Sequence, residues 1–305
     1  MHTKEIGKNL FQVELETGGY RNLICSYIIK ATKTTLIESG PTSSVPVLVS
    51  GLKELGIPFE DVQYLAITHV HLDHGGGAGT LLKFLPNAKV LVHARGMAHL
   101  INPEHLWQSA QTVLGFVSEV FGKPEPVPEK QIIPITEGIF DLGDGEKLKA
   151  IETLGHASHN LSYQESFNNG IFPGDAAGTY FPEFDVVVPT TPPPFRLDVA
   201  LASLDRIIGL QPTALYYSHF GKASTAIQRL KDYKLQLELW ARIAEEGVKQ
   251  NWRFEQIRDR IMTEDKVMSQ VEIAAFIRSH HIYSKTVLEN CVKGFIEYAQ
   301  QKLSS

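Results

Sequence analysis

The feature that most constrains the fold is an apolar strand that runs directly into a cluster of histidines. Residues 62–68 form a nearly continuous apolar run, typical of a strand buried on both faces. His69, His71, Asp73 and His74 follow within six residues, where the chain has to turn. Because alternate residues of a strand share one side, we expect His69, His71 and Asp73 to converge on one point. His74 would then face a second point.

This residue set predicts a metal site. Neutral imidazoles and carboxylates are ligands for zinc, manganese and iron, and a cluster rich in both without a thiolate fits any of the three. The chain has two cysteines, Cys25 in a strand pattern and Cys291 in a helical pattern, and they lack the spacing of a metal site or of a disulfide framework. We expect both to be buried thiols.

Short strands and helices alternate before and after the cluster. The pattern predicts an antiparallel meander, then a helix over 45–55, the strand 62–68, a helix over 75–85 and a strand over 89–92. The meander strands are expected at 10–15, 23–29 and 34–37. A helix over 103–121 and an extended, proline-rich connector over 123–128 come next.

A second set of short strands follows, spaced as neighbouring antiparallel strands would be. These are expected at 132–135, 139–142, 148–152, 161–164 and 170–172. Two strand-rich halves therefore flank a common core. From about residue 225 nearly everything is helical in pattern, with helices expected over 227–244, 254–262, 271–278 and 286–302. We expect a helical tail packed on the core.

Composition narrows the location and the partners. Of 305 residues, 43% are hydrophobic and 21% charged, near the average of globular proteins, and the net charge is −5. The acidic balance disfavours a nucleic-acid partner. No run approaches the roughly 20 apolar residues that span a bilayer, and the first residues do not resemble an export signal. A cytoplasmic protein without a membrane partner is expected.

The stretch from Thr68 to Gly76, Thr-His-Val-His-Leu-Asp-His-Gly-Gly, resembles the signature of the metallo-β-lactamase superfamily. Its later motifs have counterparts in the same order: His156 after Gly155, Asp175 in Pro-Gly-Asp, and His219 in Tyr-Ser-His-Phe-Gly. The resemblance implies an α/β fold, a four-layer αβ/βα sandwich of two mixed β-sheets. It assigns residues 1–224 to a catalytic domain and 225–305 to a C-terminal helical extension.

The resemblance also implies a binuclear metal centre. His69, His71 and His156 would bind one ion, Asp73, His74 and His219 the other, and Asp175 would bridge them. Two divalent ions are expected, Zn²⁺ first, with Mn²⁺ or Fe²⁺ left open. Two such ions share a water and lower its pKa, toward about 7 for one zinc ion, which gives a bridging hydroxide as the nucleophile. Asp73 is the candidate to orient that water and to pass its proton to the leaving group.

The superfamily includes enzymes of several reaction types. The differences between this sequence and each branch of the superfamily therefore have to indicate the reaction. Asp175 argues against penicillin cleavage, because those members typically lack the bridging aspartate. We expect hydrolysis of a carboxylic ester or lactone in a small acyl substrate. The first alternative is a thioesterase similar to glyoxalase II, whose anionic substrate would need cations such as Arg229, Lys231, Lys234 and Arg242. A phosphodiesterase or nuclease and a non-catalytic metal-binding protein are the further alternatives.

Three residues outside the ligand set are candidate site residues. Tyr180 follows Asp175 two places later than the tyrosine of the related lactonases, whose hydroxyl assists the carbonyl oxygen. Phe195 ends a stiff apolar segment, expected to be a loop, that is a candidate wall for the substrate. His159 is a candidate partner of a metal-binding imidazole or of the substrate. His2, His280 and His281 are expected at the surface, and a homodimer through the tail is left open.

Overall fold

The computed structural model describes residues 1–279 and 285–304, and His280 and His281 lie outside the described residues. Its contacts divide the chain into two compact units. The first comprises Met1–Glu152, His159–Gly174 and Pro212–Ser224, and the second comprises Thr153–Ser158, Asp175–Gln211 and Thr225–Ser305. This grouping differs from the expected split after residue 224, and the division into catalytic and helical domains stays a prediction. Each unit is described by itself.

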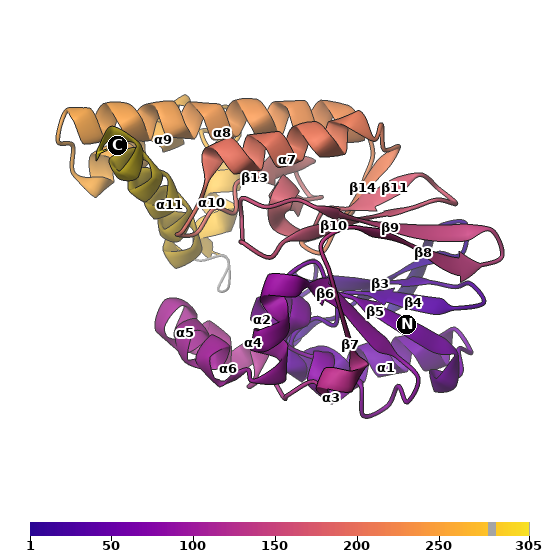
Figure 1. The fold of residues 1–305 in the computed structure, drawn as a ribbon. Coiled ribbons are helices and arrows are strands. Elements are labelled where there is room, and N and C mark those ends of the chain that lie inside the picture. Colours follow the sequence, from indigo (N-terminus) through magenta and orange to yellow (C-terminus); the bar gives the residue numbers. More distant parts are fainter. Residues whose placement is uncertain (280–284, 305) are drawn as a thin grey trace. The chain divides into compact units, whose positions relative to one another are not determined.

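The first sheet of the first unit has seven strands, in the order β1-β2-β3-β4-β5-β6-β7 (Figure 1). They are β1 Thr3–Gly7, β2 Leu10–Glu14, β3 Cys25–Ile29, β4 Thr34–Ile37, β5 Val62–Ala66, β6 Lys89–His93 and β7 Ile132–Ile135. Strands β2 to β4 form the expected antiparallel meander, and β1, which was not predicted, extends it by pairing with β2. Strands β4 to β7 are parallel, so the carboxyl ends of β4 and β5 lie at one edge of the sheet.

The second sheet of this unit has six strands, in the order β15-β14-β11-β10-β9-β8. They are β8 Gly138–Gly143, β9 Glu146–Glu152, β10 Leu161–Glu165, β11 Gly170–Phe172, β14 Ala214–Tyr217 and β15 Gly221–Ala223. β9 and β11 both run antiparallel to β10, and β11 is parallel to β14. Strands β9, β11 and β14 therefore run in the same direction and end at the same edge.

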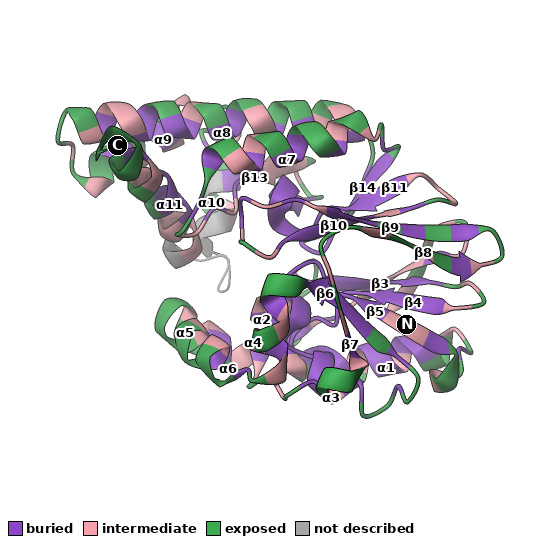
Figure 2. Ribbon diagram, in the orientation of Figure 1, coloured by how far each residue is buried: buried purple, intermediate pink, exposed green. Residues whose placement is uncertain are grey.

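The core of the first unit lies between the two sheets. Its cluster of buried residues includes Tyr27 and Ile37 from the first sheet and Tyr163 and Phe172 from the second. The rings of Tyr27 and Phe172 pack in a tilted arrangement with their centroids 5.0 Å apart. The Tyr163 hydroxyl donates toward backbone carbonyls of Ile67 and Leu91, at 3.1 and 3.2 Å, which satisfies its polar end inside the core. The middle strands of both sheets are accordingly buried (Figure 2).

One strand pairs differently from the prediction. Residues 132–135 were expected beside the strand at 139–142, but β7 pairs in parallel with β6 in the first sheet. The chain between β6 and β7 passes through three helices, and such a crossover joins parallel strands. The strand itself is where the pattern predicts it. Spacing along the sequence did not identify its partner.

The helices of the first unit are shorter than expected. They are α1 Val45–Glu54, α2 Leu72–Gly75, α3 Ala78–Leu81, α4 Met97–Ile101, α5 Glu104–Leu114 and α6 Phe116–Phe121. The expected helix over 103–121 is broken at Gly115, whose φ of 56° is left-handed and unfavourable for other residues. The expected helix over 75–85 is likewise divided between α2 and α3 and the turns around them.

The second unit is mainly helical. Its helices are α7 Leu197–Gly209, α8 Ala226–Lys249, α9 Phe254–Glu264, α10 Val271–Ser279 and α11 Lys285–Ser304, which confirms the C-terminal helices. Strands β12 Thr179–Phe181 and β13 Val186–Val188 form a separate antiparallel hairpin, where a loop was expected. The buried Asp265 joins α8 to the turn after α9, because Trp240 Nε1 and Gln236 Nε2 both donate to it.

Candidate metal centre

The histidine cluster lies where β5 ends and α2 begins. The strand alternation ends at His71, which is the residue before the first turn of α2, and Asp73 and His74 lie inside that turn. Asp73 therefore lies with His74. Strand geometry alone had suggested that Asp73 would converge with His69 and His71, and that expectation is wrong because the strand ends before Asp73. His69 Nε2 and His71 Nδ1 face each other at 3.0 Å. The cluster thus presents two adjacent groups of donor atoms.

Asp73, His74 and His219 come together within the first unit. Their ligand atoms all lie within 4.8 Å of one another, a grouping that could hold a metal ion. His219 Nε2 is 3.2 Å from His74 Nε2 and 3.2 Å from Asp73 Oδ2. His219 is 145 residues from His74 in the sequence and follows β14, so the fold of the two sheets creates this group.

The partners of the ring nitrogens determine which nitrogen carries the lone pair that can bind a metal. His219 Nδ1 donates to the Leu23 carbonyl at 2.9 Å, because a carbonyl can only accept. His74 Nδ1 faces the Glu38 carboxylate at 3.0 Å and donates to it. In a neutral imidazole the other nitrogen, Nε2, then carries the lone pair. Both rings therefore point a metal-binding atom at the group they share with Asp73.

Glu38 contacts the candidate ligand His74 and is a residue that sequence reasoning missed. It is fully buried just after β4 and accepts from the Thr68 backbone amide and hydroxyl and from the Ser218 hydroxyl. The Thr68 hydroxyl donates its proton to Glu38, so the Thr68 hydroxyl oxygen accepts from His69 Nδ1 at 3.0 Å. The lone pair of His69 is then on Nε2. Glu38 follows β4 at the edge where β5 also ends, but the sequence alone does not show that these two strands are neighbours, so no signal in the sequence identified Glu38.

The second unit holds the other two candidate ligands together. His156 Nε2 is 3.5 Å from Asp175 Oδ2, and both side chains are nearly buried. His156 Nδ1 donates to the Thr190 carbonyl at 2.8 Å, and the Thr190 hydroxyl lies 3.4 Å from Asp175 Oδ2. Gly155, just before His156, has a φ of 133°, and a side chain there would meet Ala200 at 2.6 Å. The sequence therefore places His156 in a turn that only glycine allows.

The donor set and its spacing fit divalent metal ions. Two ligands of one tetrahedral zinc ion stand roughly 3.3 Å apart when each bond is about 2.0–2.1 Å long. The separations of 3.2 Å at His219 and 3.5 Å at His156 agree with that value. All the donors are imidazoles and carboxylates, which suit zinc, manganese or iron. The residues present therefore fit the expected metals.

The additional candidate residues lie in different surroundings. The His159 ring centroid is 5.9 Å from that of His71 and 6.3 Å from that of His69, so His159 lies beside the cluster. The Tyr180 hydroxyl donates to Asp185 at 2.7 Å, and its ring lies under Arg229. Burial and this hydrogen bond raise the pKa of Tyr180 to about 12. The catalytic role of Tyr180 stays a prediction.

Phe195 packs inside the second unit. Its ring centroid is 4.9 Å from that of Phe295 on α11, and its side chain is 3% exposed. Cys291 and Phe295 on α11 are buried as well, so the apolar side chains of this helix pack within the unit. A role of Phe195 in binding substrate stays a prediction. His93 has a structural environment: its Nδ1 accepts from the Arg95 amide and its Nε2 contacts Glu152 at 2.8 Å.

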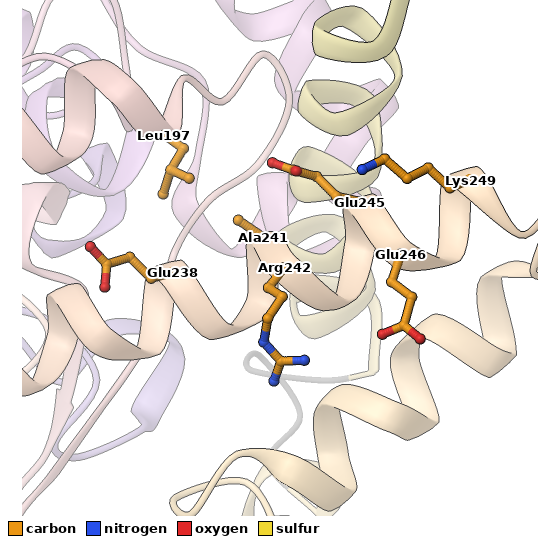
Figure 3. Close-up of a pocket in the computed structure, with 7 residues that line it drawn as sticks. All are labelled: Leu197, Glu238, Ala241, Arg242, Glu245, Glu246 and Lys249. Carbon is orange, nitrogen blue, oxygen red and sulfur yellow. The ribbon is translucent and has the colours of Figure 1, made fainter.

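A separate cavity of about 360 Å³ lies on α8 and differs from the histidine sites (Figure 3). Its lining is Leu197, Glu238, Ala241, Arg242, Glu245, Glu246 and Lys249. Two of the charges are paired, Arg242 with Glu264 and Glu245 with Lys302. The lining contains no imidazole, so this cavity is not a candidate for the predicted metals.

Comparison with known proteins identifies the family. The model of the metallo-β-lactamase superfamily matches residues 23–219, which contain all seven candidate ligands. The chain therefore belongs to the metallo-β-lactamase superfamily. Two mixed sheets flanked by helices, with further C-terminal helices, are the fold expected from the sequence, and that expectation is confirmed.

Among individual proteins, the chain is similar to the metallo-beta-lactamase fold-containing protein ST1585 of Sulfurisphaera tokodaii. The two are 35% identical over 199 residues, which cover 64% of this chain and 71% of that protein. The crystal structure of ST1585 superposes with a TM-score of 0.71 and 25% identity, over 96% of this chain and 100% of that one. The family protein TTHA1429 of Thermus thermophilus superposes with a TM-score of 0.66 over 92% and 89%, at 19% identity, which shows the fold.

A further relative is the uncharacterized protein YobT of Bacillus subtilis, 28% identical over 155 residues, or 50% of this chain and 60% of that protein.

Across residues 1–279 and 285–304, no helix combines the length and apolar character needed to cross a membrane.

Proposed function

We propose that the protein is a metal-dependent hydrolase that cleaves a carboxylic ester or lactone in a small acyl substrate. Seven residues would hold two divalent ions, with Zn²⁺ preferred: His69, His71, Asp73, His74, His156, Asp175 and His219. The observation that carries the proposal is the orientation of the imidazoles. In His69, His74, His156 and His219, a protein oxygen holds Nδ1, which leaves Nε2 to bind a metal.

Strand direction supports one common site. His69 follows β5, while His156, Asp175 and His219 follow β9, β11 and β14. Those three strands end at the same edge of the second sheet. Ligands that follow parallel strands at one edge can meet although they are far apart in sequence. The proposal joins them to the histidine cluster at the end of β5, as the family signature implies.

When bound, the two ions would acidify a water and polarise the carbonyl of the substrate. The chain itself would supply orientation and proton transfer. Asp73 is the residue for proton transfer, because its side chain is 22% exposed while the side chains of His74 and His219 beside it are almost completely buried. It would accept the proton of the attacking water and deliver it to the leaving oxygen.

The charges of the second unit favour a neutral substrate over an anionic thioester. Of the cations that a glutathione conjugate would need, Arg229 pairs with Asp185, Lys234 with Asp205 and Arg242 with Glu264. A cation that is already neutralised by a carboxylate attracts an anionic substrate less strongly. The net charge of −5 likewise disfavours a nucleic-acid substrate, because the phosphate backbone is negatively charged. A thioester remains the first alternative within the same chemistry.

The test combines metal analysis with a panel of lactones, esters, thioesters and phosphodiesters. Purified protein should bind two divalent ions and hydrolyse a lactone or ester. His71→Ala and Asp175→Asn should each reduce turnover by at least about 100-fold, since each removes a metal ligand. His105→Ala is the control, because His105 is exposed on α5. Full turnover by both ligand variants, or cleavage of phosphodiesters alone, would refute the proposal.

A further inference from the structure

Thr190 contacts both candidate ligands of the second unit. Its carbonyl accepts the His156 Nδ1 proton at 2.8 Å, and its hydroxyl lies 3.4 Å from Asp175 Oδ2. The carbonyl determines which imidazole nitrogen carries the lone pair and how the ring is oriented. The hydroxyl acts on the carboxylate that lies 3.5 Å from the same imidazole. The position of the backbone segment 190–195 therefore determines the geometry of the ligand pair.

Helix α11 holds this segment in place. The Thr191 hydroxyl donates to the Cys291 carbonyl at 3.2 Å, and the Thr191 amide points at Cys291 Sγ at 3.5 Å. Thr191 and Cys291 are both buried. At Gly294 the helix comes so close that an added side-chain carbon would stand 1.9 Å from the Thr191 carbonyl oxygen. Any side chain at position 294 must therefore displace the segment or the helix.

A second contact fastens the end of the same segment. Phe195 packs against Phe295 and Tyr298 of α11, with ring centroids 4.9 and 6.5 Å away. Between the β12–β13 hairpin and α11 remains a cavity of about 20 Å³, bordered by Thr190, Val287 and Cys291 among others. That volume holds about one water or a methyl group, which is too small for an acyl chain. The contact between the segment and α11 is therefore structural packing and not a substrate site.

We infer that α11 positions the metal ligands: Cys291 and Gly294 fix Thr190 and Thr191, and Thr190 in turn orients His156 and Asp175. This inference rests on the proposed function, because it assigns the helical tail a role in holding divalent ions. Thr190 and Gly294 are positioning residues, since they act on the ions through His156 and Asp175. The helix would set metal affinity although it supplies no ligand.

The first test is Gly294→Ala, with Gly209→Ala as the matched control. Both glycines lie in helices of the second unit, but a side chain at Gly209 has no neighbour within 4 Å. Zinc affinity is measured by competition with a chromophoric chelator, and circular dichroism verifies the fold at the same temperature. We expect at least one ion to bind about 10- to 100-fold more weakly in Gly294→Ala, the range typical for lost partners of metal ligands. Gly209→Ala should match the wild type.

A folded Gly294→Ala protein with wild-type affinity for both ions would overturn the inference. If Gly294→Ala does not fold, Thr191→Val gives the answer, because it keeps the size of the side chain and removes the hydrogen bond to Cys291. Thr191→Val should weaken zinc binding and Thr191→Ser, which restores the hydroxyl, should recover most of it. Equal affinities of Thr191→Val and the wild type would overturn the inference in that case.

A second test uses the reciprocity of coupled binding. If α11 favours metal binding, metal binding must favour the docked helix. Amides of residues 288–299 should therefore exchange more slowly with deuterium after zinc is added to the metal-free wild type. If zinc binds and these amides do not change, the inference fails while the proposed function stands. If the wild type binds no divalent ion, both fail.

Discussion

At the scale of single residues, the candidate ligands could be predicted from the sequence, and the residues that contact them could not. Four potential ligands in six positions after a strand predict a metal site from the sequence alone. Glu38 and Thr190 leave no such signal, because a single carboxylate and a single carbonyl gain meaning only from the fold around them. Glu38 lies 36 residues before His74, and Thr190 lies 34 residues after His156. Their contacts depend on sheet pairing and on the hairpin.

Removal of the Glu38 carboxylate should destabilise the protein and weaken its metal site. In Glu38→Ala, the donors of Thr68, His74 and Ser218 would lose a buried acceptor. Unsatisfied buried donors cost about 1–3 kcal/mol each, so we expect a loss of about 3 kcal/mol in the free energy of unfolding. Urea denaturation of the metal-free protein measures this. Glu60→Ala, at an exposed position, is the control, and equal stability of the two variants would contradict the role of Glu38.

The hydroxyl of Tyr180 predicts a dependence of stability on alkaline pH. Burial, followed by the hydrogen bond to Asp185, raises the pKa of Tyr180 from 10.0 to about 12. A pKa that is raised on folding contributes stability that is complete below the unfolded pKa and is lost as the pH rises through the folded pKa. The difference in unfolding free energy between the wild type and Tyr180→Phe should therefore be constant below pH 10 and shrink from pH 10 toward 12. A constant difference up to pH 12 would contradict this assignment.

At the scale of elements, hydrophobic periodicity predicted where most helices and strands lie. It did not predict which strands pair or where a helix is interrupted. The strand over 132–135 is present but pairs with β6, because partner choice depends on the crossover between the strands. Gly115 divides the expected helix over 103–121, although a lone glycine inside a helical pattern is often tolerated. The β12–β13 hairpin was expected to be a loop because prolines make this part of the chain stiff and unsuited to a core strand. Strands of only three residues leave no periodic signal that would correct this.

Asp265 is predicted to hold the C-terminal helices together. It accepts from Gln236 and Trp240 on α8 and from the backbone amides of Val267 and Met268. Asp265→Ala should lower the free energy of unfolding by about 3 kcal/mol, because several buried donors would lose their acceptor. Chemical denaturation followed by circular dichroism tests this against Asp259→Ala, an exposed aspartate on α9. A difference below about 1 kcal/mol would show that the contacts of Asp265 contribute little.

At the scale of the whole molecule, the family signature predicted the two mixed sheets and the C-terminal helices. It did not predict that residues 175–211 group with those helices in one compact unit. The reason is packing: Phe195 contacts Phe295, and Thr191 contacts Cys291, over about a hundred residues of sequence. Such contacts leave no periodic signal. The homodimer and the cytoplasmic location stay predictions.

A chain truncated after Ser224 should therefore not fold cooperatively. Truncation would remove α8 and α11, which bury Trp240 and Phe295 within the second unit, and would leave Phe195 without its packing partner. The apolar side chains that pack against these helices in the intact protein, Phe195 among them, would be exposed. Their exposure should cause aggregation or a broad thermal transition. Size-exclusion chromatography and thermal denaturation of residues 1–224 check this. A monomeric fragment with a sharp transition would instead support an independent catalytic domain.

The proposed binuclear centre is tested most directly by counting the metal ions bound by the wild type and by His219→Ala after loading with zinc and removal of excess. His219 is decisive because it joins Asp73 and His74 only through the fold. We expect two tightly bound ions in the wild type and the loss of one in His219→Ala, with the fold retained. A wild type without bound ions, or a variant that keeps both at unchanged affinity, would contradict it.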